Sequence, residues 1–401
     1  MVFIVAALIL AASFWILSKA KALEAMARAP AMMLAAGAGV SIVYRIAGGP
    51  FAPSEWAATG ADVLLAALVF VAAAQFRLSR LANVCPASFR LTIGGAPLFL
   101  VVCGLAAFIL VPHLTLGAAF LVAGALTLNG AAFDRRAVAD APAPSVIKAA
   151  VRLESAAILA LGLPVALFLE AAATAAPVGM PAVTPVYEFA ISAFKAFALG
   201  GGLGFVAAVA GNRLKTRQRA PIAIAAGAIA AVVAALIGAH PVIAAAAAGL
   251  LWGEQTAALI TTRVRMRRVV ERLAAPAAYF AFGLLLAPRL LQADLLTIVF
   301  ALAAVTIMRA GPRLVALKKT TLAKESQMFL AWFGGAPGAA SALFLISLFD
   351  AASIVAQDAA LTVGALAVTF GIIAARLTSR PLLKSLLKQT AAAKKRALFA
   401  T

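Results

Sequence analysis

The sequence predicts an all-α polytopic membrane protein of about thirteen transmembrane helices. Hydrophobic residues make up 65% of the 401 positions and charged residues only 12%, and the mean hydropathy is +1.05. No water-soluble globular domain of this length has such a composition. Lys and Arg clusters recur between the apolar runs, so the net charge of +20 marks loops on one side of a membrane. A nucleic-acid-binding protein and a soluble domain are not expected.

Thirteen apolar runs approach the roughly 20 residues that a helix needs to cross a bilayer. The first seven cover residues 2–18, 29–47, 57–76, 91–111, 115–133, 149–170 and 186–211. The other six cover residues 220–238, 240–256, 274–292, 294–312, 326–349 and 357–378. No basic segment precedes the first run, and Lys19 and Lys21 follow it, so we expect a retained span and not a cleaved signal peptide.

The basic residues alternate between the two kinds of connection. Of the 34 Lys and Arg residues, 31 follow odd-numbered spans, whereas the opposite loops hold Gly, Pro and a few acids. Basic loops are retained on the cytoplasmic side of a membrane. The sequence therefore predicts a multi-pass protein of a bacterial-type inner (plasma) membrane, with its N-terminus outside and its C-terminus in the cytoplasm.

The odd number of spans permits two inverted repeats joined by a linker helix. We expect the repeats at about 1–171 and 220–383, the linker helix at 186–211, and a basic cytoplasmic tail at 384–401. Spans five and twelve would correspond, and both are interrupted by helix-breaking residues. The interrupting residues are Gly130 in span five and Gly334, Gly335, Pro337 and Gly338 in span twelve. Paired interruptions predict a substrate site at the midplane, although Gly and Ala also simply permit close helix packing.

The order and spacing of these elements resemble the cation/proton antiporters of the sodium/proton exchanger type. The similarity runs from about residue 63 to residue 387. Gly124 to Phe133 lies where that family has Gly-x-x-x-x-x-Thr-Asp-Pro, and Glu154 to Pro164 has the length of its Glu-Ser-x-x-Asn-Asp-Gly-x-Ala-x-Pro element. Trp332 to Ser341 matches its Trp-Phe-Gly-x-Arg-Gly-x-x-Ser element. The resemblance implies an inverted-repeat antiporter-like fold, a homodimer, and monovalent cations and protons as the transported ions.

The family's ion-binding acids are absent from these motifs. Counted along them, the acidic positions fall on Ala131 and Leu159, and the neighbouring Asn falls on Ile158. An antiporter needs a carboxylate for which a proton and a cation compete. Two functions are therefore expected. The first is a secondary transporter that exchanges a monovalent cation for protons by alternating access, and the alternative is a transport-inactive relative that acts as a structural or regulatory membrane subunit.

Two charges inside the spans are candidates for an ion pair. Glu154 lies near the cytoplasmic end of span six and Arg309 near the cytoplasmic end of span eleven. A buried charge needs a partner or a water-filled cavity. We therefore predict that Glu154 and Arg309 face each other as a structural pair, a role that the resemblance also implies, with a substrate role as the alternative.

Four further residues are candidates for the substrate or ion pathway. Lys195 lies near the middle of span seven and either faces a cavity or extends its amine toward the membrane surface. Asp62 enters span three from outside and is either interfacial or part of the pathway. Thr127 and Asn129 lie at the interruption of span five. No Ser/His pair, acid dyad or metal-ligand spacing is present, so neither an enzyme nor a metal or cofactor site is expected.

Overall fold

The computed structural model describes most of the chain. The described residues are 30–46, 55–75, 77, 86–128, 144–175, 180–256, 260–334, 336–350 and 354–398. Within these residues every named element is a helix, and Thr174 and Ile354 form an isolated bridge. The predicted all-α class is therefore confirmed. The first predicted span, residues 2–18, lies outside the described residues.

The helices of the first half follow the predicted spans closely. They are α3 (Pro30–Ile46), α4 (Glu55–Ala73), α6 (Pro86–Arg90), η2 (Leu91–Gly95), α7 (Ala96–Leu110), α8 (Leu116–Thr127), α11 (Ser145–Ala157), η3 (Ile158–Gly162), α12 (Leu163–Ala173) and α13 (Thr184–Asn212). The segments η2 and η3 are single turns of π-helix inside longer helices. Such turns widen a helix locally and often mark functional positions.

The second half contains longer and more broken helices than the sequence predicts. They are α14 (Thr216–Leu236), α15 (Pro241–Gln255), α16 (Ile260–Leu290), α17 (Leu295–Val305), α18 (Ile307–Leu317), α19 (Lys324–Phe333), α20 (Ala339–Ser347), η4 (Leu348–Asp350) and α21 (Gln357–Leu398). The predicted span 294–312 is divided at Thr306, whose dihedral angles of −112° and −92° are not helical. The helix α21 continues through the predicted tail boundary at residue 383.

Six of the described helices are long and apolar enough to cross a membrane. They are Pro86–Leu110, Ser145–Ala173, Thr184–Asn212, Gln218–Leu236, Leu295–Leu317 and Gln357–Ala375. Four shorter apolar helices accompany them: Pro30–Ile46, Ala57–Ala73, Leu116–Thr127 and Ala274–Leu286. The helices confirm a polytopic membrane protein, while the total of thirteen spans remains a prediction.

The connections that were predicted to share one side of the membrane meet at one end of the molecule. Arg263, after span nine, donates a hydrogen bond of 2.7 Å to the carbonyl oxygen of Gln75, after span three. Arg77 donates one of 3.1 Å to the carbonyl oxygen of Thr256. We refer to this end as the predicted cytoplasmic end. The side of the membrane on which it lies remains a prediction.

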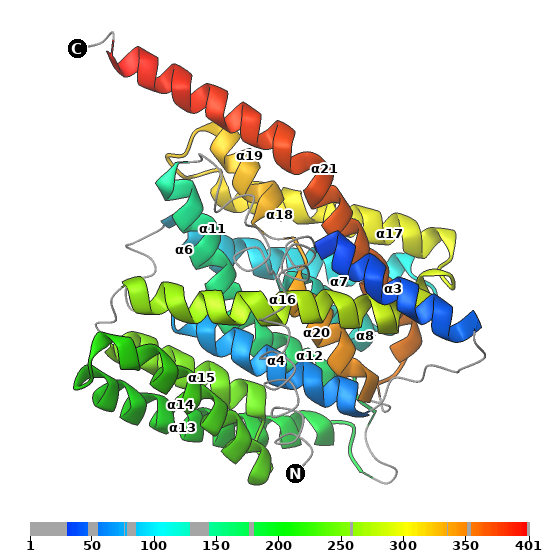
Figure 1. Cartoon of the computed structure of the whole chain (residues 1–401). Helices are drawn as coiled ribbons and strands as arrows, with labels where there is room; N and C mark the ends of the chain where they lie inside the picture. The colour runs from blue at the N-terminus through cyan, green and yellow to red at the C-terminus, as the bar shows by residue number, and fades with distance from the viewer. Residues whose placement is uncertain are drawn as a thin grey trace.

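The helices form two groups with α4 and α16 between them. Figure 1 shows α13, α14 and α15 packed together on one side, and α17, α18, α19 and α21 on the other. Small residues hold α13 close to α15, because a Cβ at Gly200 or Gly204 would overlap the carbonyl oxygens of Ala244 and Ala248. Such close contact of small residues supplies the van der Waals packing that joins helices in lipid.

Candidate functional site

The interruption of span twelve lies against the end of α8, the helix of predicted span five. The helix α8 ends at Thr127, and the next residue, Leu128, already has extended dihedral angles. The helix α19 ends at Phe333 and α20 begins at Ala339. Ser341, in the first turn of α20, donates a hydrogen bond from its hydroxyl to the carbonyl oxygen of Leu128. The predicted interruption of span twelve is therefore present, and it lies against the end of α8.

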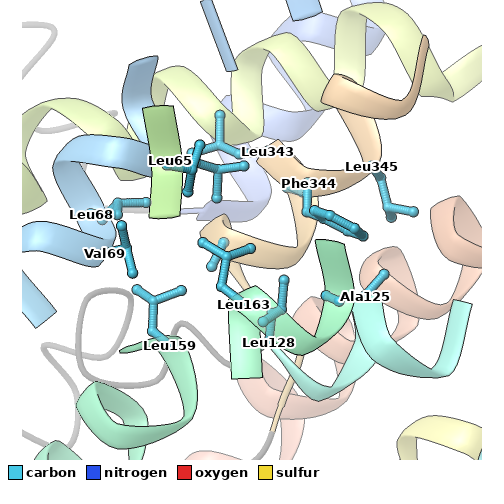
Figure 2. Packing of buried hydrophobic residues seen from close by; sticks show 14 of the residues in the cluster. Leu65, Leu68, Val69, Ala125, Leu128, Leu159, Leu163, Leu343, Phe344 and Leu345 are labelled. Carbon is cyan, nitrogen blue, oxygen red and sulfur yellow. The ribbon is translucent and has the colours of Figure 1, made fainter. Parts of the chain in front are cut away.

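Apolar side chains fill the space around this contact. The buried hydrophobic side chains labelled in Figure 2 come from α4, α8, η3, α12 and α20, together with Leu128 directly after α8. Leu65, Leu68 and Val69 of α4 are each 1% exposed or less. Because neither leucine nor valine can lose a proton or coordinate a cation, this cluster cannot perform the exchange chemistry that a carboxylate would supply there. We call it the apolar centre.

One of the positions at which the sequence predicts lost ion ligands, Leu159, lies in this apolar centre. Ile158 and Leu159 begin η3, and they are 2% and 0% exposed. A π-turn therefore begins where the family's Asn-Asp pair was expected, and both side chains are apolar. Ala131, Asn129 and Gly130 lie outside the described residues.

Glu154 forms an ion pair with Arg313, four residues beyond Arg309, the partner predicted from the sequence. Nη1 of Arg313 donates to Oε1 of Glu154, and their side chains are 4% and 0% exposed. The sequence suggested Arg309 because it lies deeper in the apolar run, whereas Arg313 was counted with the loop. In the structure α18 continues to Leu317 and buries Arg313. The two arginines are four residues apart, so they share one face of the helix.

Both arginines bind the end of α19. Arg313 donates from Nη2 to the carbonyl oxygen of Leu330 at 2.8 Å and from Nε to that of Ala331 at 2.9 Å. Arg309 donates to the carbonyl oxygen of Trp332 at 2.6 Å, and its guanidinium lies 5.7 Å from the centre of the Trp332 rings. The last carbonyls of a helix lack helical partners and carry partial negative charge. The two guanidinium groups therefore cap α19 where the chain interrupts the span.

Gly334 leaves the room that the ion pair needs. A Cβ at this position would lie 2.5 Å from Oε2 of Glu154 and closer still to Nη2 of Arg313. The backbone of Gly334 is helical, with angles of −60° and −38°, so crowding alone requires glycine here. We call Glu154, Arg313, Arg309 and Gly334 the latch. Its groups bind one another and the backbone of α19, which indicates that it positions the interruption.

The remaining pathway candidates are spread over the molecule. Lys195 is exposed on the outer surface of α13 and does not reach the apolar centre. Thr127 donates from its hydroxyl to the carbonyl oxygen of Ala123 at 2.8 Å, within its own helix. Asp62 of α4 is half-buried, and its charge interacts with that of Glu170 on α12, a residue that the sequence reasoning did not select. The sequence signal that could have identified Glu170 is that it is a carboxylate at the last position of predicted span six.

Of the other residues predicted to interrupt span twelve, the structure describes two. Pro337 and Gly338 lie between α19 and α20, and Pro337 packs against α21 at Gly371, where a Cβ would come 2.9 Å from its ring. Gly335 lies outside the described residues. In the part of the chain that the structure describes, no three His, Cys, Asp or Glu side chains gather as they would around a metal ion.

Comparisons with known proteins show the family of the chain and a similar fold. The family model for the transmembrane part of sodium/hydrogen exchangers matches residues 3–385. The fold is similar to the structure of the sodium proton antiporter MjNhaP1 from Methanocaldococcus jannaschii at pH 8, with a TM-score of 0.69 and 15% identity over 96% of this chain and 100% of that chain. An electron-microscopy structure of MjNhaP1 gives a TM-score of 0.55 and 15% identity, over 90% and 97% of the two chains. No curated protein matches the chain in sequence.

Proposed function

The chain belongs to the sodium/hydrogen exchanger family, and from that premise we propose that it exchanges a monovalent cation for protons by alternating access. The observation that carries the proposal is the contact between the two interrupted segments, through Ser341 and Leu128, on an antiporter fold. Freed backbone groups at such interruptions supply ligands for an ion near the middle of a membrane. Membership and fold support a cation:proton antiporter, whereas the mechanism is our proposal.

The proposed coupling carboxylates are Asp62 and Glu170. They lie on α4 and α12, the two helices that also contribute Leu65 and Leu163 to the apolar centre. Asp62 precedes Leu65 by three residues, and Glu170 follows Leu163 by seven, which places both carboxylates toward the predicted outer end. Their charges interact, so a proton or a cation bound at either carboxylate would relieve their mutual repulsion. Competition for such a position is the coupling that exchange requires.

A second function, a transport-inactive structural or regulatory subunit, is favoured by the apolar centre itself. Alternating access requires one group of helices to move relative to another. Here α4 packs on α20 and η3 through fully buried leucines. Large apolar contacts oppose relative movement of packed bodies. A transport-inactive subunit would tolerate this packing, because its helices need not move. An exchanger must separate the packed helices in every transport cycle.

The experiment that decides between them is a flux assay in sealed proteoliposomes. An imposed pH gradient, read by an internal pH dye, should collapse on addition of Na⁺ or K⁺ but not of choline. Asp62→Asn and Glu170→Gln should each slow this response by about tenfold or more, because only the titratable form couples the ions. Glu188→Gln is the matched control, because Glu188 is an exposed carboxylate on α13.

Each outcome has a defined meaning. No cation-dependent response in the natural protein, with an active antiporter run beside it, would support the inactive subunit. A response that survives both substitutions would remove Asp62 and Glu170 from the mechanism. A response lost equally in Glu188→Gln would indicate a general effect of charge and would likewise remove the assignment.

We also propose a homodimer and the orientation that the charges predict. The outer surface of α13 carries Tyr187, Phe194 and Phe197, which are 65%, 77% and 54% exposed, beside Lys195. A second copy would cover these rings. Cross-linking of Phe194→Cys in membranes tests the contact. A cysteine at Gly49 should react with an impermeant reagent in intact cells, and one at Lys319 only after permeabilisation, whereas the reverse pattern would invert the orientation.

A further inference from the structure

The last helix continues far beyond its apolar part. The apolar span of α21 covers Gln357–Ala375, and the helix then runs without a break to Leu398. From Arg376 to the end of the sequence there are seven basic residues and no acidic residue. We call residues 376–398 the basic extension. No acidic side chain of its own is available to neutralise it.

One side of the basic extension packs on the core of the protein. Leu386 is 1% exposed and belongs to the same apolar cluster as Phe329 and Phe333 of α19. Trp332 donates a hydrogen bond of 2.8 Å from its indole nitrogen to the hydroxyl of Thr378. The extension is therefore held against α19, the helix whose end the latch caps.

The opposite side of the basic extension carries exposed lysines. Lys384 and Lys388 are exposed, and each lies two residues from the buried Leu386. Two residues correspond to a rotation of about 200° around a helix, so both lysines point away from the packed side. Arg376 and Arg380 precede them in the same series of four-residue steps. Around Leu386 the helix is consequently apolar toward the protein and carries Lys384 and Lys388 on the opposite side.

We propose that this basic side binds anionic phospholipid headgroups of the leaflet from which α21 emerges. The apolar span ends at Ala375, so Lys388 lies only about 20 Å further along the helix axis. Figure 1 shows α21 as one long helix that runs obliquely to α16 and extends past α19. Anionic leaflets attract nearby lysines over about one Debye length, about 8 Å at physiological ionic strength.

The membrane is a better partner than a soluble polyanion because the series of basic residues begins at Arg376, directly after the apolar span ends at Ala375. A nucleic acid or an acidic protein would have to approach the same side from solution and displace the headgroups. The inference does not depend on transport, since the contacts of α21 with α19 are present whatever the chain transports. Bound lipid would hold the extension, and through Trp332 and Leu386 the end of α19, in its packed position.

The test is hydrogen exchange of backbone amides in residues 382–398, measured by mass spectrometry on the full-length protein in nanodiscs. Exchange should be at least about fivefold slower in discs with 30% phosphatidylglycerol than in pure phosphatidylcholine, which is the effect of one lysine near an anionic surface. The difference should disappear at high salt. Lys384→Gln with Lys388→Gln should remove it, whereas the control pair Lys318→Gln with Lys319→Gln, two exposed loop lysines, should retain it.

Three results would overturn the proposal. The first is equal exchange in the two lipid compositions. The second is loss of the lipid effect in both double variants, which would trace it to net charge and not to this side of α21. The third is the same slowing by a short DNA duplex added to phosphatidylcholine discs, which would assign the surface to a soluble polyanion.

Discussion

Replacement of Gly334 by alanine tests the latch most directly. The added methyl carbon would lie 2.5 Å from Oε2 of Glu154 and closer to Nη2 of Arg313, so the two groups must separate. Separation of a buried ion pair costs roughly 3–5 kcal/mol, because each charge loses its partner without gaining water. For a chain of 401 residues this corresponds to a fall of at least about 4 °C in melting temperature. Thermal unfolding in detergent measures it.

The control for this prediction is Gly311→Ala on α18, the helix that carries both arginines. A Cβ at Gly311 meets no atom within 4 Å, so alanine should be neutral or stabilise the helix by about 0.5–1 kcal/mol. If Gly334→Ala unfolds at the same temperature as the natural protein, the ion pair is not confined as the structure has it. The reasoning about the latch would then be wrong.

Two other changes give separate tests. A double-mutant cycle of Glu154→Gln with Arg313→Gln should show a coupling energy of about 1–3 kcal/mol, larger than that of the cycle with Arg309→Gln; the reverse ranking would restore the partner predicted from sequence. Leu159→Asp should lower the melting temperature far more than Leu159→Met, because only aspartate brings a charge into the apolar centre.

The spans were predictable because each depends on a local run of sequence. Hydropathy gave the ends of α13 and α15 to within two residues. Hydropathy alone could not show that α17 ends at Val305 and α18 begins at Ile307, since the break lies in the dihedral angles of Thr306 and not in its polarity. The interruption after α19 was predictable because Gly334–Gly338 contains both glycine and proline.

The sequence predicted a site residue only where a charged side chain lay inside an apolar run. Glu154 was selected because a carboxylate in an apolar run needs a partner, but the choice between Arg309 and Arg313 depends on how far α18 continues beyond the apolar run. Lys195 could not be assigned to a cavity or to the surface, because hydropathy does not tell which side of α13 faces the protein. The surroundings of Leu159 come in part from α4, far away in sequence, so only the fold could reveal them.

The geometry of the latch also restricts where coupling can occur. A coupling carboxylate must exchange its proton for a cation once in every cycle, so it must be able to leave its partners. Glu154 is fully buried against Arg313, and Arg313 is bound at the same time to two carbonyl oxygens of α19. Releasing Glu154 would leave a guanidinium buried without its counter-charge, at a cost of several kcal/mol that the transported ion would have to supply. The exchange proposed above therefore assigns coupling to Asp62 and Glu170, whose charges interact with each other, and not to Glu154, the residue that the sequence made most conspicuous.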